Sequence, residues 1–330
     1  MTRNIDCEIV ADSINPNQNR LCSYIVTLPR FIWSEFLTHR QVSRNAASSR
    51  AIPVKKMIKM LREGGAHPEF WGSNKPGMQA NEQLTGDDMK EARRLWDEAK
   101  MNAIDSSEKM MEVGLHKQIS NRILEAWCPY KALVSATEWK NFFGLRAHPD
   151  AQPEFQVLAY RMLDAYLNST PAELEWGEWH IPFGDQMPEG LDLDTMLRVA
   201  IARAARLSYL TFDGLMDIAK DLALYEQLMV SEPLHASPAE HVAKAAPSLW
   251  YHFENDTPAK TITSGGFQTV SSSSDEAESK HSLILPYDDE GNHQGNFVGF
   301  TQYRKLQPNE CIRDIDLEAV MSNKPAWVDL

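Results

Sequence analysis

The 330-residue chain lacks the sequence features of several protein classes. Its four cysteines form no CxxC pair and show no spacing typical of metal ligands, which favours a reducing compartment over a disulfide scaffold. No run of about 18 apolar residues could span a membrane, and the start of the chain shows no apolar stretch typical of a signal peptide. We therefore expect a cytoplasmic protein without a membrane partner.

Common cofactor and catalytic motifs are also missing. No GxGxxG follows a predicted strand, and the patterns GxxxxGK[ST], HExxH and GxSxG do not occur. The sequence thus carries no signature of a Rossmann dinucleotide site, a Walker A loop, a zincin centre or a serine-hydrolase elbow. The ten histidines are scattered, and the pair His148 and Asp150 is too weak a pattern to indicate a ligand set. We predict no metal site.

Positive charge is scarce overall but concentrated in one segment. The formal net charge is −13, which argues against a broad surface for nucleic acid. In contrast, residues 38–53, THRQVSRNAASSRAIP, hold three arginines, one histidine and three serines but no acidic residue. Guanidinium and hydroxyl groups are the usual donors for phosphates and carboxylates. The segment indicates an anionic-ligand site, although a charge run of this kind can also be a solvated face.

Hydrophobic periodicity predicts mainly helices, with a few strands, in a single domain over residues 1–330. The apolar alternation of residues 22–28 predicts a strand. Most of the 38–53 segment should be a connection between two helices. Residues from about 256 to 294 are polar and turn-rich, and we expect a mobile loop there. The predicted helices cover residues 30–40, 54–63, 88–113, 115–127, 153–167, 191–210 and 213–229.

Three separated stretches match motifs of one enzyme family. Residues 38–50 fit the pattern RHR-x2-S-x-N-x2-S-x-R at every position but the first. Residues 135–155 contain an Asn-x4-Arg pair, Asn141 and Arg146, followed by Ala-Gln and a helix. Residues 235–241, HASPAEH, fit H-x-[ST]-P-x-E-H. In these motifs the chain resembles the flavin-dependent thymidylate synthases.

The order of the motifs differs from the common order in that family. There the H-x-[ST]-P-x-E-H turn precedes the RHR motif, whereas here it follows some 200 residues later. We interpret the chain as a circularly permuted or divergent member, since permutation is tolerated where termini lie together at the surface. The resemblance implies an α/β fold with a mixed sheet and helices.

The resemblance also implies a reaction and its partners. Family members transfer a one-carbon unit from methylenetetrahydrofolate to C5 of dUMP and reduce it with FADH2, which NADPH regenerates, to give dTMP. It therefore implies FAD as cofactor, with NADPH and methylenetetrahydrofolate as co-substrates. A homotetramer with shared active sites is implied too, with no nucleic-acid partner.

The matched positions suggest roles for individual residues. Arg146 matches the arginine placed at the pyrimidine, and we assign it the catalytic role of stabilising negative charge. The alternative for Arg122 is a structural salt bridge, for Asn141 a surface amide and for Glu240 a carboxylate at a helix start. The nucleotide-binding residues implied are Ser48, Ser49, Arg50, Arg122 and Arg146, with Arg304 added as a hypothesis. The flavin-binding residues implied are His39, Arg40, Ser43, Asn45, Asn141, His235, Ser237 and Glu240.

Some positions depart from the family pattern. Thr38 stands where the family has an arginine, Ala46 where it has an acid, and Glu35 where it has a glutamine. We hypothesise that Gln302 and Arg304, near the C-terminus, fold back and replace the missing donors; a plain strand with exposed polar residues is the alternative.

These exchanges leave the substrate open. A related C5 methyl- or hydroxymethyltransferase acting on UMP or dCMP is one alternative, because one or two hydrogen bonds decide between such bases. A catalytically silent relative that binds nucleotide or nucleic acid is an alternative of another class. A flavoprotein oxidoreductase without a folate step is a third.

Overall fold

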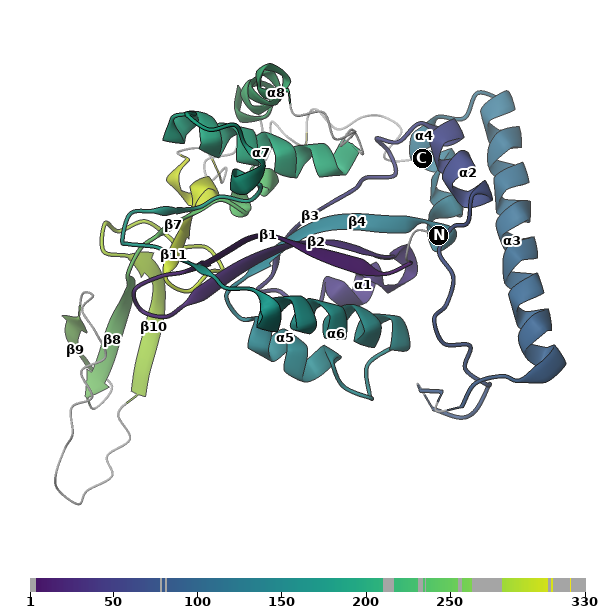
Figure 1. Cartoon of the computed structure of the whole chain (residues 1–330), viewed down its shortest axis with the longest axis horizontal. Helices are drawn as coiled ribbons and strands as arrows, with labels where there is room; N and C mark the ends of the chain where they lie inside the picture. Colours follow the sequence, from purple (N-terminus) through teal and green to yellow (C-terminus); the bar gives the residue numbers. More distant parts are fainter. Residues whose placement is uncertain are drawn as a thin grey trace.

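The computed structural model describes residues 4–77, 79, 80, 82–209, 217–230, 234, 236–254, 257–262, 281–307, 310 and 321. In this part of the chain, a twisted sheet lies between two helical layers, and a third group of helices stands at one end of the sheet (Figure 1). The mixed α/β class predicted from sequence is confirmed.

The main sheet contains five strands. They are β1 (Asp6–Ile14), β2 (Arg20–Pro29), β3 (Ser43–Ala46), β4 (Pro129–Ala136) and β5 (Ala172–Glu173), in the order β3-β4-β2-β1-β5. All pairings are antiparallel except β1 with β5, so the sheet is mixed. The strand predicted at 22–28 is therefore confirmed as β2. Segment 38–53 is not simply the connection predicted, because four of its residues form strand β3, which pairs with β4.

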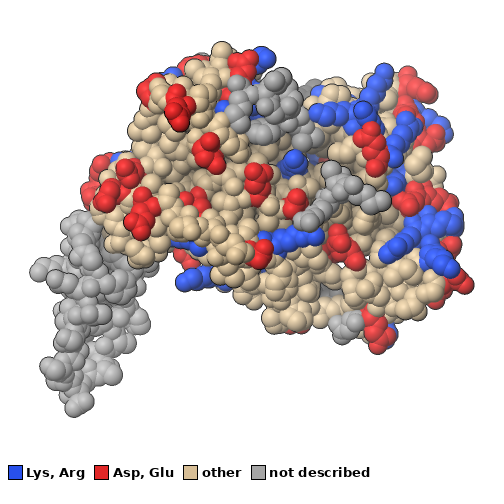
Figure 2. Space-filling view, viewed as in Figure 1, with Lys and Arg blue, Asp and Glu red and all other residues tan. Residues whose placement is uncertain are grey.

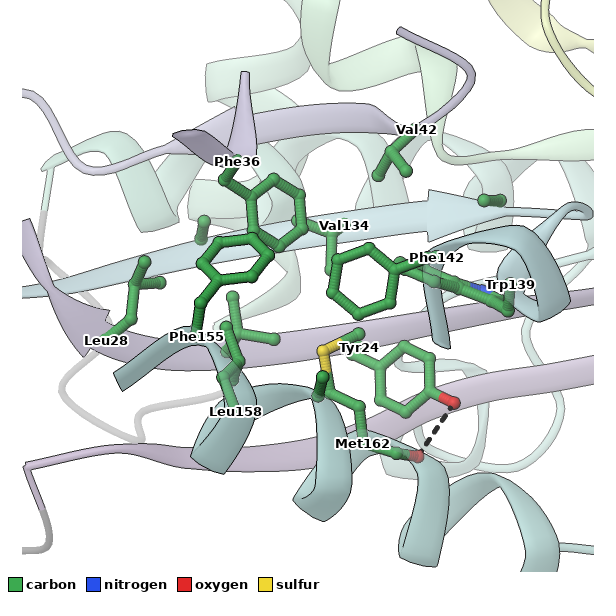
Figure 3. Close-up of a cluster of buried hydrophobic side chains, with 14 of the residues drawn as sticks. Tyr24, Leu28, Phe36, Val42, Val134, Trp139, Phe142, Phe155, Leu158 and Met162 are labelled. Atoms are coloured by element: carbon green, nitrogen blue, oxygen red, sulfur yellow. Dashed lines mark hydrogen bonds between the residues drawn. The ribbon is translucent and has the colours of Figure 1, made fainter. Parts of the chain in front are cut away.

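One face of the sheet packs against α5 (Trp139–Arg146) and α6 (Pro153–Asn168). Alternate residues of β2 point into this layer, as the two-residue period of a strand requires. Figure 3 shows Phe36, Phe142 and Phe155 packed against one another in this layer. The hydroxyl of the neighbouring Tyr24 donates to the carbonyl of Met162 at 3.3 Å. The predicted amphipathic helix 153–167 is confirmed as α6 and buries its apolar stripe here.

The opposite face is covered by α7 (Leu193–Tyr209), with α8 (Ile218–Val230) packed on α7 (Figure 1). Leu133 of β4 and Val10 of β1 form a core with Ala204 and Leu207 of α7. Since both faces are covered, β2 is buried along most of its length. Polar residues that lie on the α7 face are therefore buried as well, and they form the network described below.

Three helices gather at the end of the sheet: α2 (Val54–Arg62), α3 (Gly86–Glu112) and α4 (Lys117–Ser120) (Figure 1). The helices predicted at 54–63 and 88–113 are confirmed as α2 and α3. The single helix predicted over 115–127 is wrong: it divides at Asn121 into α4 and the 3-10 helix η2 (Arg122–Trp127). The helix predicted at 30–40 is also too long, because the structure has only η1 (Arg30–Ile32) and α1 (Trp33–Phe36).

Two small antiparallel sheets complete the described fold. One has the order β11-β7-β6, from Phe300–Gln302, Ala243–Ala245 and Trp179–His180. The other has the order β10-β8-β9, from His281–Asp288, Ser248–Glu254 and Thr257–Ile262. The mobile loop expected at about 256–294 is thus corrected where the structure describes it, since β9 and β10 lie in that range; residues 263–280 are outside the described residues. Short 3-10 helices are η3 (Gly184–Gln186), η4 (Ser237–Glu240) and η5 (Tyr303–Leu306).

The surface carries charges of both signs. On the face shown in Figure 2, basic side chains gather mainly at the end that bears α2 and α3, where acidic side chains are interleaved with them. Within the described ranges, none of the helices combines the length and the apolar character needed to cross a membrane. The same residues contain no cluster of three or more histidine, cysteine or acidic side chains able to hold a metal ion.

Candidate functional site

Arg146 and His39 form a hydrogen-bonded pair between two of the predicted motifs. Arg146 is the last residue of α5, and His39 follows α1. The Arg146 Nε–H donates to His39 Nε2 at 2.8 Å, and Nη2 donates to Thr38 Oγ1 at 3.3 Å. The guanidinium also lies over the Phe155 ring, 4.9 Å from its centroid. Two predicted site residues 107 positions apart are therefore in direct contact.

The charge state of His39 fits this contact. Burial, together with the nearby cations Arg146 and Arg44, lowers the pKa of His39 to about 4. The ring is therefore neutral at pH 7, so Nε2 is a lone-pair acceptor and the proton sits on Nδ1. Phe142 and Phe155 flank the ring, with centroids 5.0 and 6.1 Å away. These contacts fix the direction of the imidazole and, through it, of the guanidinium.

Arg146 keeps its charge available for a ligand. Among the described residues, no carboxylate lies within ion-pair distance of it. The pKa of Glu35 is raised by burial, and this effect is larger than the lowering caused by the nearby Arg146. A half-buried cation whose partners are a neutral ring and a hydroxyl can stabilise negative charge on a bound molecule.

The C-terminal segment folds back onto β3, as predicted. The Gln302 side-chain amide donates to Ser43 Oγ at 2.8 Å, to the Glu240 carbonyl at 3.0 Å and to Asn296 Oδ1 at 2.9 Å. These bonds link the first and third motifs. However, Gln302 reaches Ser43 and Glu240 rather than positions 35 and 38, where the missing donors were expected. The buried Ser43 hydroxyl therefore accepts one hydrogen bond, from Gln302, and donates another, to Asn296 Oδ1.

Glu240 is paired inside the chain. Arg304 Nη1 bonds to Glu240 Oε1, and Arg304 Nε donates to Glu310 Oε2 at 2.8 Å. Arg304 is thus placed between two carboxylates, and its predicted nucleotide contact stays a prediction. Asn45 donates to the backbone carbonyl of Ala204 in α7, and Ser237 is exposed at the start of η4.

The residues predicted to bind the nucleotide lie in one loop. Ser48 is half-buried, Ser49 is buried and Arg50 is exposed. Residues 48–52 contact α4 rather than Arg122. Arg122 instead pairs with Glu125 at 2.9 Å, which is the structural salt bridge considered as its alternative.

Two of the predicted flavin residues, Asn141 and Arg40, have no partner among the described residues that would place them in a site. Asn141 is exposed on α5 and Arg40 is exposed between α1 and β3, without an ion pair in the described ranges. His235 lies outside the described residues. Their roles stay predictions.

Residues 20–172 match the family model described as "Thymidylate synthase complementing protein". This stretch, somewhat less than half of the chain, is therefore similar to that family. The match covers β2 to β5 with α5 and α6, and it includes the first two motifs but not the third.

Other comparisons are distant. No curated protein matches the chain. Among solved structures, a UMP/dUMP methylase PolB from Streptomyces cacaoi bound with 5-Br UMP is 19% identical, with a TM-score of 0.42, over 49% of this chain and 88% of that one. The same methylase bound with 5-Br dUMP is 18% identical, with a TM-score of 0.42, over 49% of this chain and 89% of that one.

The structure also contains a buried network of polar side chains that the sequence analysis did not predict. It links five elements through Ser13, His180, Ser23, Ser135 and His241, all of them buried. His180 bonds to Ser13 at 2.9 Å and to Ser23 at 2.8 Å; Ser23 bonds to Ser135, and Ser135 to His241 Nδ1 at 2.9 Å. Burial lowers the pKa of both histidines to about 3, so both rings are neutral. The only sequence signal was His241 itself, the last residue of the third motif.

The chemistry of the residues present fits the flavin that the family resemblance implies. His241 directly follows Glu240, and its Nε2 atom is buried and has no hydrogen-bond partner among the described residues. Arg40 offers an exposed cation of the kind that a dinucleotide pyrophosphate needs. Neutral His39 brings a ring flanked by aromatic side chains.

Proposed function

We propose that the chain is an FAD-dependent thymidylate synthase. It would transfer a one-carbon unit from methylenetetrahydrofolate to C5 of dUMP, with NADPH as reductant, and release dTMP. At a coarser level, the proposal is a C5 methyltransferase for a pyrimidine nucleotide. The match of residues 20–172 to the thymidylate synthase complementing protein model supports it, and one feature of the site gives it a mechanism.

That feature is the positioned guanidinium of Arg146. Attack by C5 on a one-carbon electrophile requires electron density to move into the pyrimidine ring, and negative charge then develops at N3 and its neighbouring oxygens. A fixed cation lowers the energy of that charge most when its orientation is set before the reaction. His39 and Thr38 set the orientation here, through hydrogen bonds of 2.8 and 3.3 Å.

Neutral His39 has a second consequence for the proposed reaction. Because its pKa lies near 4, it stays an acceptor for Arg146 throughout the neutral range and does not compete with the ligand for a positive charge. FAD, when bound and reduced, would supply the hydride that completes the methyl group. The chain's own residues orient the nucleotide and hold the cation.

Arg146→Gln and Arg146→Lys test the proposal. The enzyme is incubated with FAD, NADPH, methylenetetrahydrofolate and dUMP, and the product is identified by mass. We expect dTMP from the wild type, and a loss of about 10²-fold or more in kcat for Arg146→Gln, which is typical for removal of a preorganised charge-stabilising donor. Arg146→Lys should restore little of the lost kcat, because an ammonium group cannot reproduce the planar arrangement of N–H donors that bonds to His39 and Thr38.

Lys140→Ala is the matched control, because Lys140 is an exposed cation on the same helix. Its kcat should equal that of the wild type. If the wild type bound FAD but formed no methylated product with dUMP, UMP or dCMP, the proposal would be wrong. Failure to bind FAD at all would support the silent relative.

Thr38 is the observation that favours a different nucleotide. It occupies the position where the resemblance places an arginine and accepts a hydrogen bond from Arg146, so a hydroxyl stands beside Arg146 in place of a second cation. A related transferase acting on UMP or dCMP, with a methyl or hydroxymethyl product, is the second candidate. The relative kcat/KM values for dUMP, UMP and dCMP decide between the two.

A nucleic-acid-binding relative is less well supported. The basic side chains on the face in Figure 2 are interleaved with acidic ones, whereas nucleic-acid surfaces carry extended basic patches. The family also supports a homotetramer with shared active sites as part of the proposal. Sedimentation equilibrium would test that state.

A further inference from the structure

The loop formed by residues 48–52 is attached to α4 through its carbonyl oxygens. The two residues that hold it, Lys117 and Asn121, lie four positions apart at the two ends of α4 and so face the same side. Asn121 is fully buried. Its side-chain amide donates to the carbonyls of Ser49 at 2.7 Å and Ile52 at 2.9 Å, and Lys117 Nζ donates to the carbonyl of Ala51 at 3.1 Å.

These bonds determine where the loop's N–H groups point. In a planar trans peptide, the carbonyl of one residue and the N–H of the next point in opposite directions. Since the carbonyls of Ser49 and Ala51 face α4, the N–H groups of Arg50 and Ile52 face away from it. In the described part of the chain, neither N–H has a hydrogen-bond partner, while the Ala51 N–H closes the turn onto Ser48 at 3.0 Å.

Ser49 supplies a further donor in this loop. The residue is 3% exposed, and within the described residues its hydroxyl has no hydrogen-bond partner. The Arg50 guanidinium is exposed and, within the ranges the structure describes, makes no ion pair. A buried hydroxyl left unsatisfied costs about 1–3 kcal/mol, so it points to a group that satisfies it when bound.

The start of α2 adds to this arrangement. The helix begins at Val54, directly after the loop, and its N-cap is Pro53, without a side-chain cap. The first turn of this helix carries the positive end of the helix dipole. Residues 49–54 therefore supply backbone donors, a hydroxyl and a guanidinium from one short stretch, the donor set that suits a phosphate monoester.

We propose that Asn121 and Lys117 are positioning residues that turn the carbonyls of loop 48–52 toward α4 and thereby present the N–H groups of Arg50 and Ile52 to a phosphate group. The inference rests on the proposed function in one respect: the phosphate is there identified as the 5′-phosphate of the pyrimidine nucleotide. Asn121 and Lys117 touch the loop and not the ligand.

Binding measured by calorimetry tests the role of the two residues. The probes are dUMP, deoxyuridine, which lacks the phosphate, and inorganic phosphate. We expect Asn121→Leu and Lys117→Met to weaken dUMP binding about tenfold or more, as the loss of one or two hydrogen bonds predicts, and to leave deoxyuridine binding unchanged. Lys117→Arg retains a donor for the Ala51 carbonyl and should stay within about threefold of the wild type.

Lys59→Met is the control for loss of positive charge, because Lys59 is exposed on α2 and pairs only with Glu63. It should bind dUMP as the wild type does. If Asn121→Leu does not fold, the comparison of Lys117→Met with Lys117→Arg carries the test by itself. Equal dUMP affinity in wild type and Lys117→Met would overturn the inference.

Amide spectra follow the loop directly. In protein selectively labelled with 15N-arginine and 15N-isoleucine, inorganic phosphate should shift the amide signals of Arg50 and Ile52 in the wild type and not in Lys117→Met. Such shifts without dUMP turnover would support the inference and contradict the proposed function. Turnover of dUMP with no shift of either amide would contradict the inference alone.

Discussion

Thr38 and His39 show how one residue exchange is accommodated at this site. Where the family has an arginine, Thr38 is a short side chain that accepts from Arg146, while its hydroxyl donates to the Glu35 carbonyl at 2.7 Å. His39 provides the stronger contact with the same guanidinium, at 2.8 Å. The orientation of the Arg146 guanidinium therefore depends on His39 more than on the exchanged position.

A His39→Phe variant tests this dependence. Phenylalanine keeps a ring between Phe142 and Phe155 but removes the acceptor for Arg146 Nε. We expect kcat to fall by about 10²-fold, the effect of misplacing a catalytic group by about 1 Å, with little change in the dissociation constant of dUMP. His39→Gln, whose amide oxygen can accept, should recover part of the activity; equal kcat in His39→Phe and wild type would contradict the role.

The buried polar chain can be tested at Ser135. Its hydroxyl bonds to both Ser23 and His241, so Ser135→Ala leaves the buried His241 Nδ1 without this partner and removes one of the two partners of Ser23, which keeps its bond to His180. We predict that the free energy of unfolding falls by about 2 kcal/mol, measured by urea titration. Ser34→Ala, at an exposed position of α1, should stay within about 0.5 kcal/mol of the wild type. An equal loss in both variants would mean that these buried hydrogen bonds contribute nothing to the free energy of unfolding.

The two buried histidines also predict a pH dependence of stability. Burial lowers the pKa of His180 and His241 to about 3, whereas the unfolded rings titrate near 6.5. Below about pH 6.5 the unfolded chain therefore binds protons that the folded chain does not. The free energy of unfolding should fall as the pH falls from about 6.5 toward 3, by up to about 1.4 kcal/mol per pH unit for each ring. Urea titrations at pH 7.5 and 5.5 measure the slope, which should be shallower in His241→Asn.

At the scale of elements, β11 and the residues before it lock the third motif onto β3. Gln302 supplies the central contact, and Gly295 makes room for it: Gly295 has a φ of +88°, and a Cβ there would overlap with the Gln302 amide oxygen. Glycine is thus required at this position by both backbone conformation and space.

Gly295→Ala should displace Gln302 from Ser43. We predict a larger loss of unfolding free energy than for Gly114→Ala, which has a comparable φ of +83° but meets no atom within 4 Å. The strain at positive φ costs about 1 kcal/mol or more in both variants. The additional loss of unfolding free energy in Gly295→Ala therefore measures the cost of displacing the Gln302 amide. Thermal or urea unfolding of the two variants gives the difference, and no excess would show that the amide contributes little.

The elements differ in how far their sequence predicted them. Helix α6 was predictable because a long apolar stripe determines its burial, and β2 because its alternation is regular. The break at Asn121 was not, because the cause is tertiary: the side chain bonds to the loop at Ser49 and Ile52. Likewise β3 is polar and short, and only its pairing with β4 makes it a strand.

The site was predictable in part for the same reason. The motif resemblance predicted Arg146 and His39 as site residues, but the hydrogen bond between them depends on how α1 and α5 pack. The buried serine and histidine chain had no local pattern, since its five members come from five elements. Glu240 was a prediction from the third motif alone, and its pairing with Arg304 and Glu310 could not be inferred from spacing.

At the scale of the whole molecule, the third motif follows the first by nearly 200 residues and still packs against it. Gln302 bonds to both Ser43 and the Glu240 carbonyl, so the two motifs share one surface despite their reversed order along the chain. This proximity is what a composite site requires. The circular permutation itself stays a prediction about the origin of that order.

The reaction catalysed with dUMP tests the central claim most directly. Purified protein is reconstituted with FAD and incubated with NADPH, methylenetetrahydrofolate carrying a 13C one-carbon unit, and dUMP, and the nucleotide product is analysed by mass. The account predicts dTMP with the label in its methyl group, and a loss of about 10²-fold or more in Arg146→Gln. Unlabelled nucleotide from the wild type, or equal product from Arg146→Gln, would contradict it.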